Sequence, residues 1–186
     1  MIMKNLIFPV FIIALFCCAS CIKGKHSKEI KTIDSLISVT DTIKNNLDAS
    51  DTTKIKEAFK EYNENIGQIR TFFNDKKDST WSTITAYGNL KNPLKNFILN
   101  YPALYNEILY SKKQLNDLKA DIRGNKITKE KMAEYTKNEA QAINSLKQHV
   151  NISVNNVKRN LYFFDSLNPK VVKVIEQLKK NFRKAG

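Results

Sequence analysis

An apolar stripe at helical spacing runs through 33 residues in the second half of the chain. It begins at Met132 and ends at Phe164, and its members recur mainly at intervals of three and four residues. This spacing places them on one face of an α-helix. With Thr128 as its N-cap, the stripe predicts one helix from about residue 128 to 166, roughly 55 Å long at 1.5 Å per residue. A helix of that length predicts an elongated fold.

Shorter segments with the same periodicity occupy the rest of the chain after the first thirty residues. They predict helices over about 28–47 and 55–73, a short helix after Thr80, a helix from Pro93 to Gly124, and a last helix that begins at Asn168-Pro169. Pro102 predicts a kink or break. Gly124 is expected to end its helix in a left-handed conformation.

No segment alternates as a β-strand does, and the connections between the expected helices are short. A short connection makes consecutive helices antiparallel neighbours, so the helix at 28–47 should pair with the helix that follows it. The sequence therefore predicts an all-α fold. We expect one antiparallel up-and-down helical bundle over residues 28–186, with the helix at 128–166 as its longest member.

The first twenty residues have the layout of a secretory signal. Lys4 precedes an apolar run from Leu6 to Ala19, which ends in small residues. Fourteen apolar residues form a helix of only about 21 Å, short of the roughly 30 Å hydrocarbon core of a bilayer. The run is therefore a poor permanent membrane span.

The end of this run, Cys18-Ala19-Ser20-Cys21, resembles the lipobox of bacterial lipoproteins, although Cys18 stands where the motif prefers leucine. The resemblance covers about a ninth of the chain. It implies cleavage of residues 1–20, a diacylglyceryl group on the Cys21 sulfur and an acyl chain on its amino group. Several chains on one residue attach a protein to its membrane almost permanently. The alternatives are an ordinary cleaved signal and a short uncleaved anchor.

Residues 21–27 form a polar tether that carries the lipid. In the sorting of bacterial lipoproteins, acidic residues directly after the cysteine favour inner-membrane retention or, in some lineages, surface display. Ile22 and the basic residues after it match neither pattern. The resemblance thus favours the outer membrane, with the domain facing the periplasm.

The sequence offers few groups for catalysis or metal binding. All three cysteines lie within residues 1–21, which excludes a disulfide framework or thiolate metal site in the mature fold. His26 lies in the tether, and His149 lies at the edge of an apolar stripe without a carboxylate three or four residues away. The carboxylates on the expected helices alternate with lysines, which is typical of a solvated face. We therefore expect no enzyme activity, no metal and no cofactor other than the lipid on Cys21.

The formal charge of +13 lies mostly in the second half of the chain. Residues 22–78 carry 11 basic and 10 acidic side chains, whereas residues 79–186 carry 19 and 8. Such a field attracts anionic lipid, an anionic envelope polymer or an acidic protein partner. Nucleic acid is not expected as a partner of an exported, lipid-anchored chain. Compositional bias is the competing explanation, because 27 of the 31 basic residues are lysines.

Two features are candidates for binding. The first is a possible groove at the Pro102 break, lined by Trp81, Tyr87, Phe97, Tyr101 and Tyr105. The second is a possible contact with an anionic surface through the cations of the last helix, which are Lys170, Lys173, Lys179, Lys180, Arg183 and Lys184. The competing interpretations are ordinary core aromatics and a core helix with a solvated back.

These observations favour a non-enzymatic helical scaffold or adaptor, attached to the membrane through Cys21 and bound to a further envelope component. One alternative is a carrier that holds a small apolar ligand inside the bundle. Another is an interaction or inhibitor module displayed on the cell surface. Residue patterns do not identify the partner or the oligomeric state.

Overall fold

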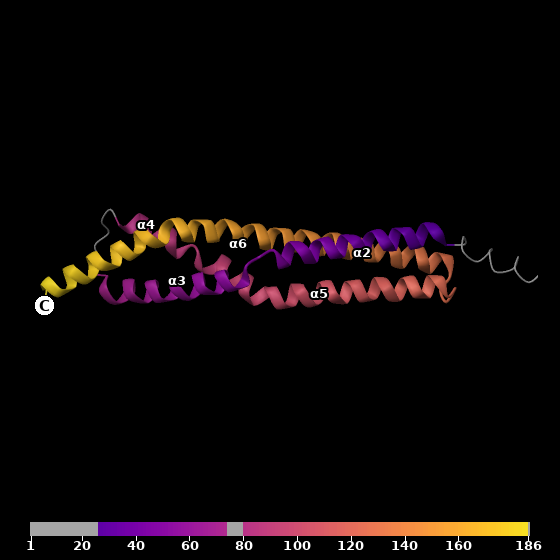
Figure 1. The fold of residues 1–186 in the computed structure, drawn as a ribbon, viewed down its shortest axis with the longest axis horizontal. Helices are drawn as coiled ribbons and strands as arrows, with labels where there is room; N and C mark the ends of the chain where they lie inside the picture. Colours follow the sequence, from indigo (N-terminus) through magenta and orange to yellow (C-terminus); the bar gives the residue numbers. More distant parts are fainter. Residues whose placement is uncertain (1–25, 74–79, 186) are drawn as a thin grey trace, which may run out of the picture.

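The computed structural model describes residues 26–73 and 80–185, and every regular element in these ranges is an α-helix (Figure 1). The predicted signal peptide, Cys21 and most of the tether lie outside the described residues. The all-α helical bundle predicted from the sequence is confirmed. The helices are α2 (Ser27–Asp48), α3 (Thr52–Phe72), α4 (Trp81–Gly88), α5 (Lys91–Arg123) and α6 (Lys129–Ala185).

The helices form a rod of three side-by-side segments, which we call legs: α2 with α3, α4 with α5, and α6 alone. In Figure 1, α2 and α3 follow one another in the same direction, α4 and α5 return, and α6 runs back along the whole rod. Salt bridges and hydrogen bonds between the legs show these directions. Asp34 pairs with Lys119 and Asp41 with Lys112, so α2 and α5 are antiparallel. The α2–α3 leg is parallel to α6, because the residue numbers of paired side chains increase together on both. Asn46 donates a hydrogen bond to Asn151, and Lys54 forms a salt bridge with Asp165.

The predicted antiparallel pairing of the first two helices is therefore wrong. The residue after α2, Ala49, keeps nearly helical dihedrals, with φ −68° and ψ −4°. Two residues later the Asp51 side chain accepts a 2.9 Å hydrogen bond from the Lys54 amide and begins α3. No residue of this junction has a positive φ. The chain therefore continues from α2 into α3 in the same direction (Figure 1).

The last helix predicted from the sequence is not separate. α6 is a single helix of 57 residues, about 85 Å long at 1.5 Å per residue. The predicted end at 166 and new start at Asn168-Pro169 are wrong, because Pro169 lies inside α6. Pro169 is exposed, as is Asp165, whose carbonyl would otherwise bond the missing amide. Water can satisfy that carbonyl, so the helix continues.

Pro102 likewise lies exposed inside α5, and the predicted break there is also wrong. The reversal from α5 to α6 occurs at Asn125, which has a φ of 50°, whereas Gly124 has a φ of −80°. The left-handed position is thus one residue later than predicted. The predicted cap is confirmed: the Thr128 hydroxyl accepts a 3.4 Å hydrogen bond from the Lys131 amide.

The core extends along the rod axis between the three legs. Each leg supplies fully buried side chains, including Ile33, Leu47, Leu94, Leu115 and Leu146. Most of the α6 stripe from Met132 to Leu178 is buried. Several apolar residues at helical spacing are nevertheless exposed, among them Leu109, Tyr135 and, at the end of α6, Phe182. None of the helices in the described ranges has both the length and the apolarity needed to cross a membrane.

Candidate functional site

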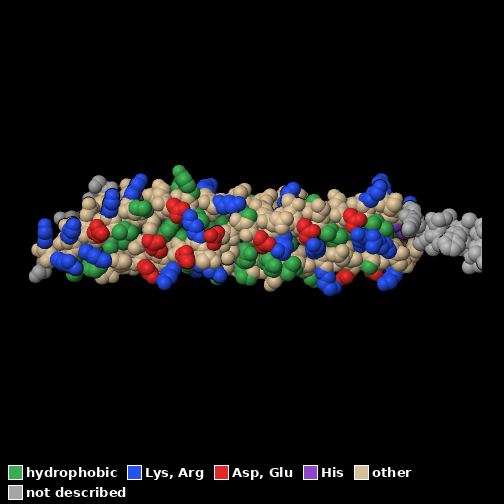
Figure 2. Space-filling view, in the orientation of Figure 1, with side chains coloured by type: hydrophobic (Ala, Val, Ile, Leu, Met, Phe, Trp, Pro, Cys, Tyr) green, Lys and Arg blue, Asp and Glu red, His purple; other side chains and the backbone are tan. Residues whose placement is uncertain are grey.

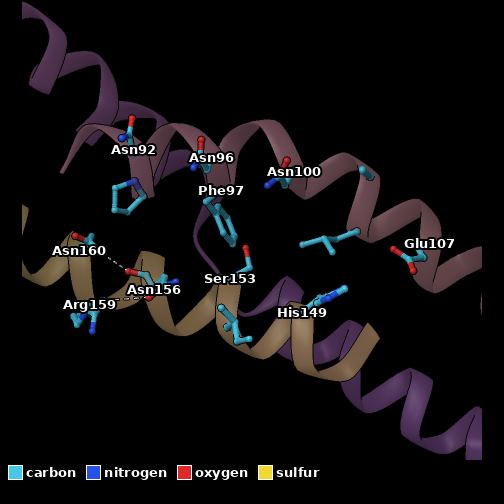
Figure 3. Close-up of a pocket in the computed structure, with 14 residues that line it drawn as sticks. Asn92, Asn96, Phe97, Asn100, Glu107, His149, Ser153, Asn156, Arg159 and Asn160 are labelled. Carbon is cyan, nitrogen blue, oxygen red and sulfur yellow. Dashed lines mark hydrogen bonds between the residues drawn. The ribbon is translucent and has the colours of Figure 1, made fainter. Parts of the chain in front are cut away.

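An open groove of about 600 Å³ lies between α5 and α6 (Figure 3). It lies near the middle of the rod, where the first half of α5 passes the middle of α6. Nine of its 14 lining residues carry polar side chains. The lining residues are Asn92, Pro93, Asn96, Phe97, Asn100, Ala103, Leu104 and Glu107 of α5, and His149, Ile152, Ser153, Asn156, Arg159 and Asn160 of α6.

Five asparagines supply most of the hydrogen-bonding groups of the groove. Asn92, Asn96 and Asn100 follow one another along the α5 rim, one helical turn apart and exposed. Across the groove, Asn160 is nearly buried and its side-chain nitrogen donates to the Asn156 carbonyl over 2.8 Å. Sequence reasoning missed this site. The four-residue spacing of asparagines beside an apolar stripe is the signal that could have indicated it.

Apolar side chains form the floor and one edge of the groove. Phe97 is 3% exposed and points from α5 toward Ser153 of α6 (Figure 3). Leu104 is half-buried, whereas Ile152 is 60% exposed. The site therefore combines amides with accessible apolar surface, the composition expected where an amphipathic ligand binds.

The two ends of the groove carry opposite charges. Glu107 lies at the end marked by His149, and Arg159 lies at the other end beside Asn156 (Figure 3). The Arg159 guanidinium donates a 3.1 Å hydrogen bond to the Asn156 side-chain oxygen. Within the described residues, neither Glu107 nor Arg159 forms a salt bridge. Both charges thus remain available to a ligand.

The five aromatic residues predicted to line a groove do not meet at one place. Phe97 lines the large groove, and with Tyr101 it also lines a smaller hollow of about 80 Å³ at Pro102. Tyr105 stacks on Tyr101, with 6.2 Å between the ring centroids. The other two lie elsewhere. The Trp81 ring packs on Phe73 with 5.4 Å between the ring centroids, and Tyr87 is completely buried.

Tyr87 instead belongs to a polar cluster that extends from the core to the exposed Glu61. Its hydroxyl donates to the Asn168 side-chain oxygen over 2.8 Å and accepts from the Asn65 side-chain nitrogen over 3.2 Å. Asn65 also donates to Asn168 over 2.9 Å, and Asn168 donates to the Glu61 carboxylate over 2.6 Å. Burial raises the pKa of the Tyr87 phenol from 10.0 to about 12. The cluster joins α3, α4 and α6 next to Pro169.

The predicted cations of the last helix lie on the final four turns of α6. Five of them are exposed, namely Lys170, Lys173, Lys180, Arg183 and Lys184. Figure 2 shows basic side chains gathered at this end of the rod. We call these five residues the cationic end.

Lys179 is the exception among the predicted cations. Its ammonium donates a 2.5 Å hydrogen bond to Gln68 and lies 5.7 Å from the centre of the Phe72 ring, so it binds α6 to α3. Next to the cationic end, Phe182 is 60% exposed and contacts Phe72 edge-on. An exposed aromatic ring among cations is typical of a contact surface.

The beginning of α2 and the end of α6 lie at opposite ends of the rod (Figure 1). Ser27, the first residue of α2, follows the predicted lipidation site at Cys21 by six residues. In the described ranges, no three histidine, cysteine, aspartate or glutamate side chains are placed to hold a metal ion. Comparison with protein-family models, curated proteins and solved structures finds no match to this chain.

Proposed function

We propose that the protein is a lipid-anchored, non-enzymatic scaffold of the bacterial envelope, which carries a binding surface on a rigid helical rod. Its acylated Cys21 attaches it to the periplasmic face of the outer membrane. Its cationic end contacts an anionic component of the envelope, either a polymer or an acidic protein. This proposal joins the lipobox resemblance of the signal to the shape of the helical part.

The observation that carries the proposal is the separation of the two ends of the rod. The tether enters α2 at one end, and the cationic end lies at the other. α6 spans about 85 Å between them. A continuous helix that packs on two other legs transmits position far better than a flexible linker. The geometry therefore suits a spacer that keeps its partner at a set distance from the membrane.

A carrier with an apolar ligand inside the bundle receives less support. The positions between the legs are filled by fully buried side chains, including Tyr87, Leu94 and Val150. The groove between α5 and α6 is open, amide-lined and at the surface of the rod. Neither feature favours an enclosed apolar ligand.

The anchor is tested by Cys21→Ala. We expect this substitution to abolish fatty-acid labelling and to move the protein from the membrane fraction to the soluble fraction. Cys18→Ala is the matched control and should leave labelling at Cys21 unchanged. Continued labelling of the Cys21→Ala chain would show that Cys21 is not the lipidation site. Protease treatment of intact cells then tests the location, since a periplasmic domain survives it.

The cationic end is tested by replacing four of its residues, Lys173, Lys180, Arg183 and Lys184, with glutamine. Lys179 is left unchanged because it stabilises the α3–α6 contact. We expect weaker cosedimentation of the full chain with purified cell-wall sacculi at low salt, because exposed charges act through a screened field. The control removes four exposed lysines elsewhere: Lys95, Lys131, Lys147 and Lys158. Equal binding of both variants to sacculi would reject a wall polymer as the partner of the cationic end.

A further inference from the structure

We propose that the groove between α5 and α6 binds an extended peptide segment of a partner protein. The segment carries an acidic side chain toward Arg159 and a basic side chain toward Glu107. This site lies on the shaft of the rod, away from both of its ends, and it does not depend on the lipid anchor. It would make the scaffold a two-site adaptor.

The spacing of the asparagines on the α5 rim matches the repeat of an extended peptide. Asn92, Asn96 and Asn100 are four residues apart, which is a rise of about 6 Å per step along the helix. In an extended chain, every second residue recurs after about 6.6–6.8 Å. An asparagine side chain offers both a donor and an acceptor, as a backbone peptide group does. Each rim amide can therefore pair with every second residue of the bound segment.

The α6 wall supplies the second row of contacts. Ser153 and Asn156 face the groove opposite the α5 rim (Figure 3). From His149 to Asn160 this wall spans eleven residues, or about 16 Å, which accommodates roughly five residues of extended chain. Side chains that alternate with the paired peptide groups would cover Phe97 and Ile152, the apolar floor and edge.

The charges at the two ends give the site its selectivity. Among the described residues, no partner of opposite charge neutralises Glu107 or Arg159, and the two belong to different helices at opposite ends of the groove. A carboxylate on the ligand gains charge-assisted hydrogen bonds from a guanidinium. An amine gains the equivalent from the glutamate. A ligand with one charge of each sign, at opposite ends of an extended chain, complements both ends of the groove.

A peptide fits this pattern better than an anionic glycan strand. A polymer with negative charge along its length would meet Arg159 favourably, but it would meet Glu107 with repulsion. It would also lack the alternation of peptide groups and side chains that the rim and the floor match. The test below includes a glycan so that this choice is decided by experiment.

The test uses two fluorescein-labelled hexapeptides of opposite polarity, Lys-Thr-Val-Thr-Val-Asp and Asp-Thr-Val-Thr-Val-Lys. Fluorescence anisotropy is measured with the full chain in detergent micelles at low salt. We expect one polarity to bind with a Kd below about 1 mM, the range of a weak single-segment site. Methylation of the backbone nitrogens should weaken that binding by about tenfold, since it removes the donors that pair with the rim amides. Failure of both peptides, or equal binding of the methylated peptide, would overturn the proposal.

Matched variants locate the binding. Asn96→Ala with Asn156→Ala removes one amide from each wall and should weaken binding by about tenfold or more. Asn106→Ala with Asn155→Ala removes two exposed amides of the same helices outside the groove and should have no effect. Arg159→Gln should reduce the discrimination between the two polarities. Equal loss in both pairs of variants, or displacement of the peptide by tetragalacturonate, an anionic glycan, at equal concentration, would reject a peptide site in the groove.

Discussion

Tyr87→Phe tests the buried polar cluster through the dependence of stability on pH. The substitution removes the hydroxyl that donates to Asn168 and accepts from Asn65. The two asparagines still bond each other, and Asn168 still bonds Glu61, so no buried amide loses every partner. We therefore expect the variant to lose only about 1 kcal/mol of unfolding free energy near neutral pH, the net contribution of a typical hydrogen bond.

At alkaline pH the wild type should no longer be more stable than the Tyr87→Phe variant. The phenol of Tyr87 has a pKa of about 12 in the fold and 10.0 as its ordinary value. Because the folded pKa is the higher one, the stabilisation is complete below pH 10 and is lost as pH rises through about 12. Between pH 8 and 11 the wild type should lose about 1.4 kcal/mol from this group alone, and the phenylalanine variant should not. The wild-type advantage near pH 8 should thus disappear near pH 11.

The assay is urea unfolding of the full chain followed by circular dichroism, in the same detergent at pH 8, 9, 10 and 11. The quantity of interest is the difference between wild type and Tyr87→Phe, because the other tyrosines and the lysines contribute to both chains. Tyr162→Phe is the control, since that side chain is 72% exposed, and its difference from wild type should not change with pH. A constant difference between wild type and Tyr87→Phe from pH 8 to 11 would refute the buried-phenol argument.

Two further substitutions test the packing of α6. Leu146→Asp places a charge at a side chain that is 1% exposed and should cost several kcal/mol. Leu99→Asp is the control, at a side chain that is 62% exposed, and should change the free energy of unfolding by no more than about 0.5 kcal/mol. Similar losses of stability in both variants would mean that α6 is not central to the core. Pro169→Ala restores a helical amide and should stabilise the protein by about 2 kcal/mol after the entropy of the unfolded chain is counted. Loss of stability in that variant would mean that the proline is required for the contacts of Asn168.

The helices themselves were predictable because burial and helical period coincide along nearly the whole chain. The error at Asn168-Pro169 has a definite origin. The apolar stripe continues through it, since Phe164, Asn168, Val171, Ile175 and Leu178 follow at steps of four and three. Asn168 is half-buried at the edge of the core and pairs with Asn65 and Tyr87. From sequence alone, an asparagine before a proline indicates a helix start more strongly than a buried polar partner from another helix.

The course of the chain was harder to predict than its helices. Ala49, Asn89 and Leu90, which lie between consecutive helices, keep nearly helical dihedrals, so α2 passes into α3 and α4 into α5 without reversal. The hairpin between α5 and α6 instead uses Asn125 at positive φ. A short loop alone therefore does not indicate an antiparallel pair. The residue type alone is not a sufficient signal either, because Asn89 follows Gly88 at a junction that does not reverse.

The candidate site was only partly accessible to sequence reasoning. Aromatic residues at helical spacing do not reveal which of them face the core, and Tyr87 proved to be completely buried while Trp81 is 38% exposed. Of the predicted groove, Phe97 and Tyr101 do line hollows near Pro102. The amide-lined groove depends on residues of two helices that are about fifty positions apart. Their approach follows from the three-legged course of the chain, which the sequence pattern did not specify.

The shape of the rod also bears on whether the basic residues result from composition or from function. Residues 129–169 of α6 carry six basic side chains in 41 positions, and residues 170–185 carry six in 16. The number of acidic residues decreases along the helix, from four in residues 129–169 to one in residues 170–185. Compositional drift toward lysine would act on exposed positions of one helix alike. The net charge is +5 over residues 170–185 and only +2 over residues 129–169. This excess, at the end of α6 that is farthest from the start of α2, is better explained by a contact at that end.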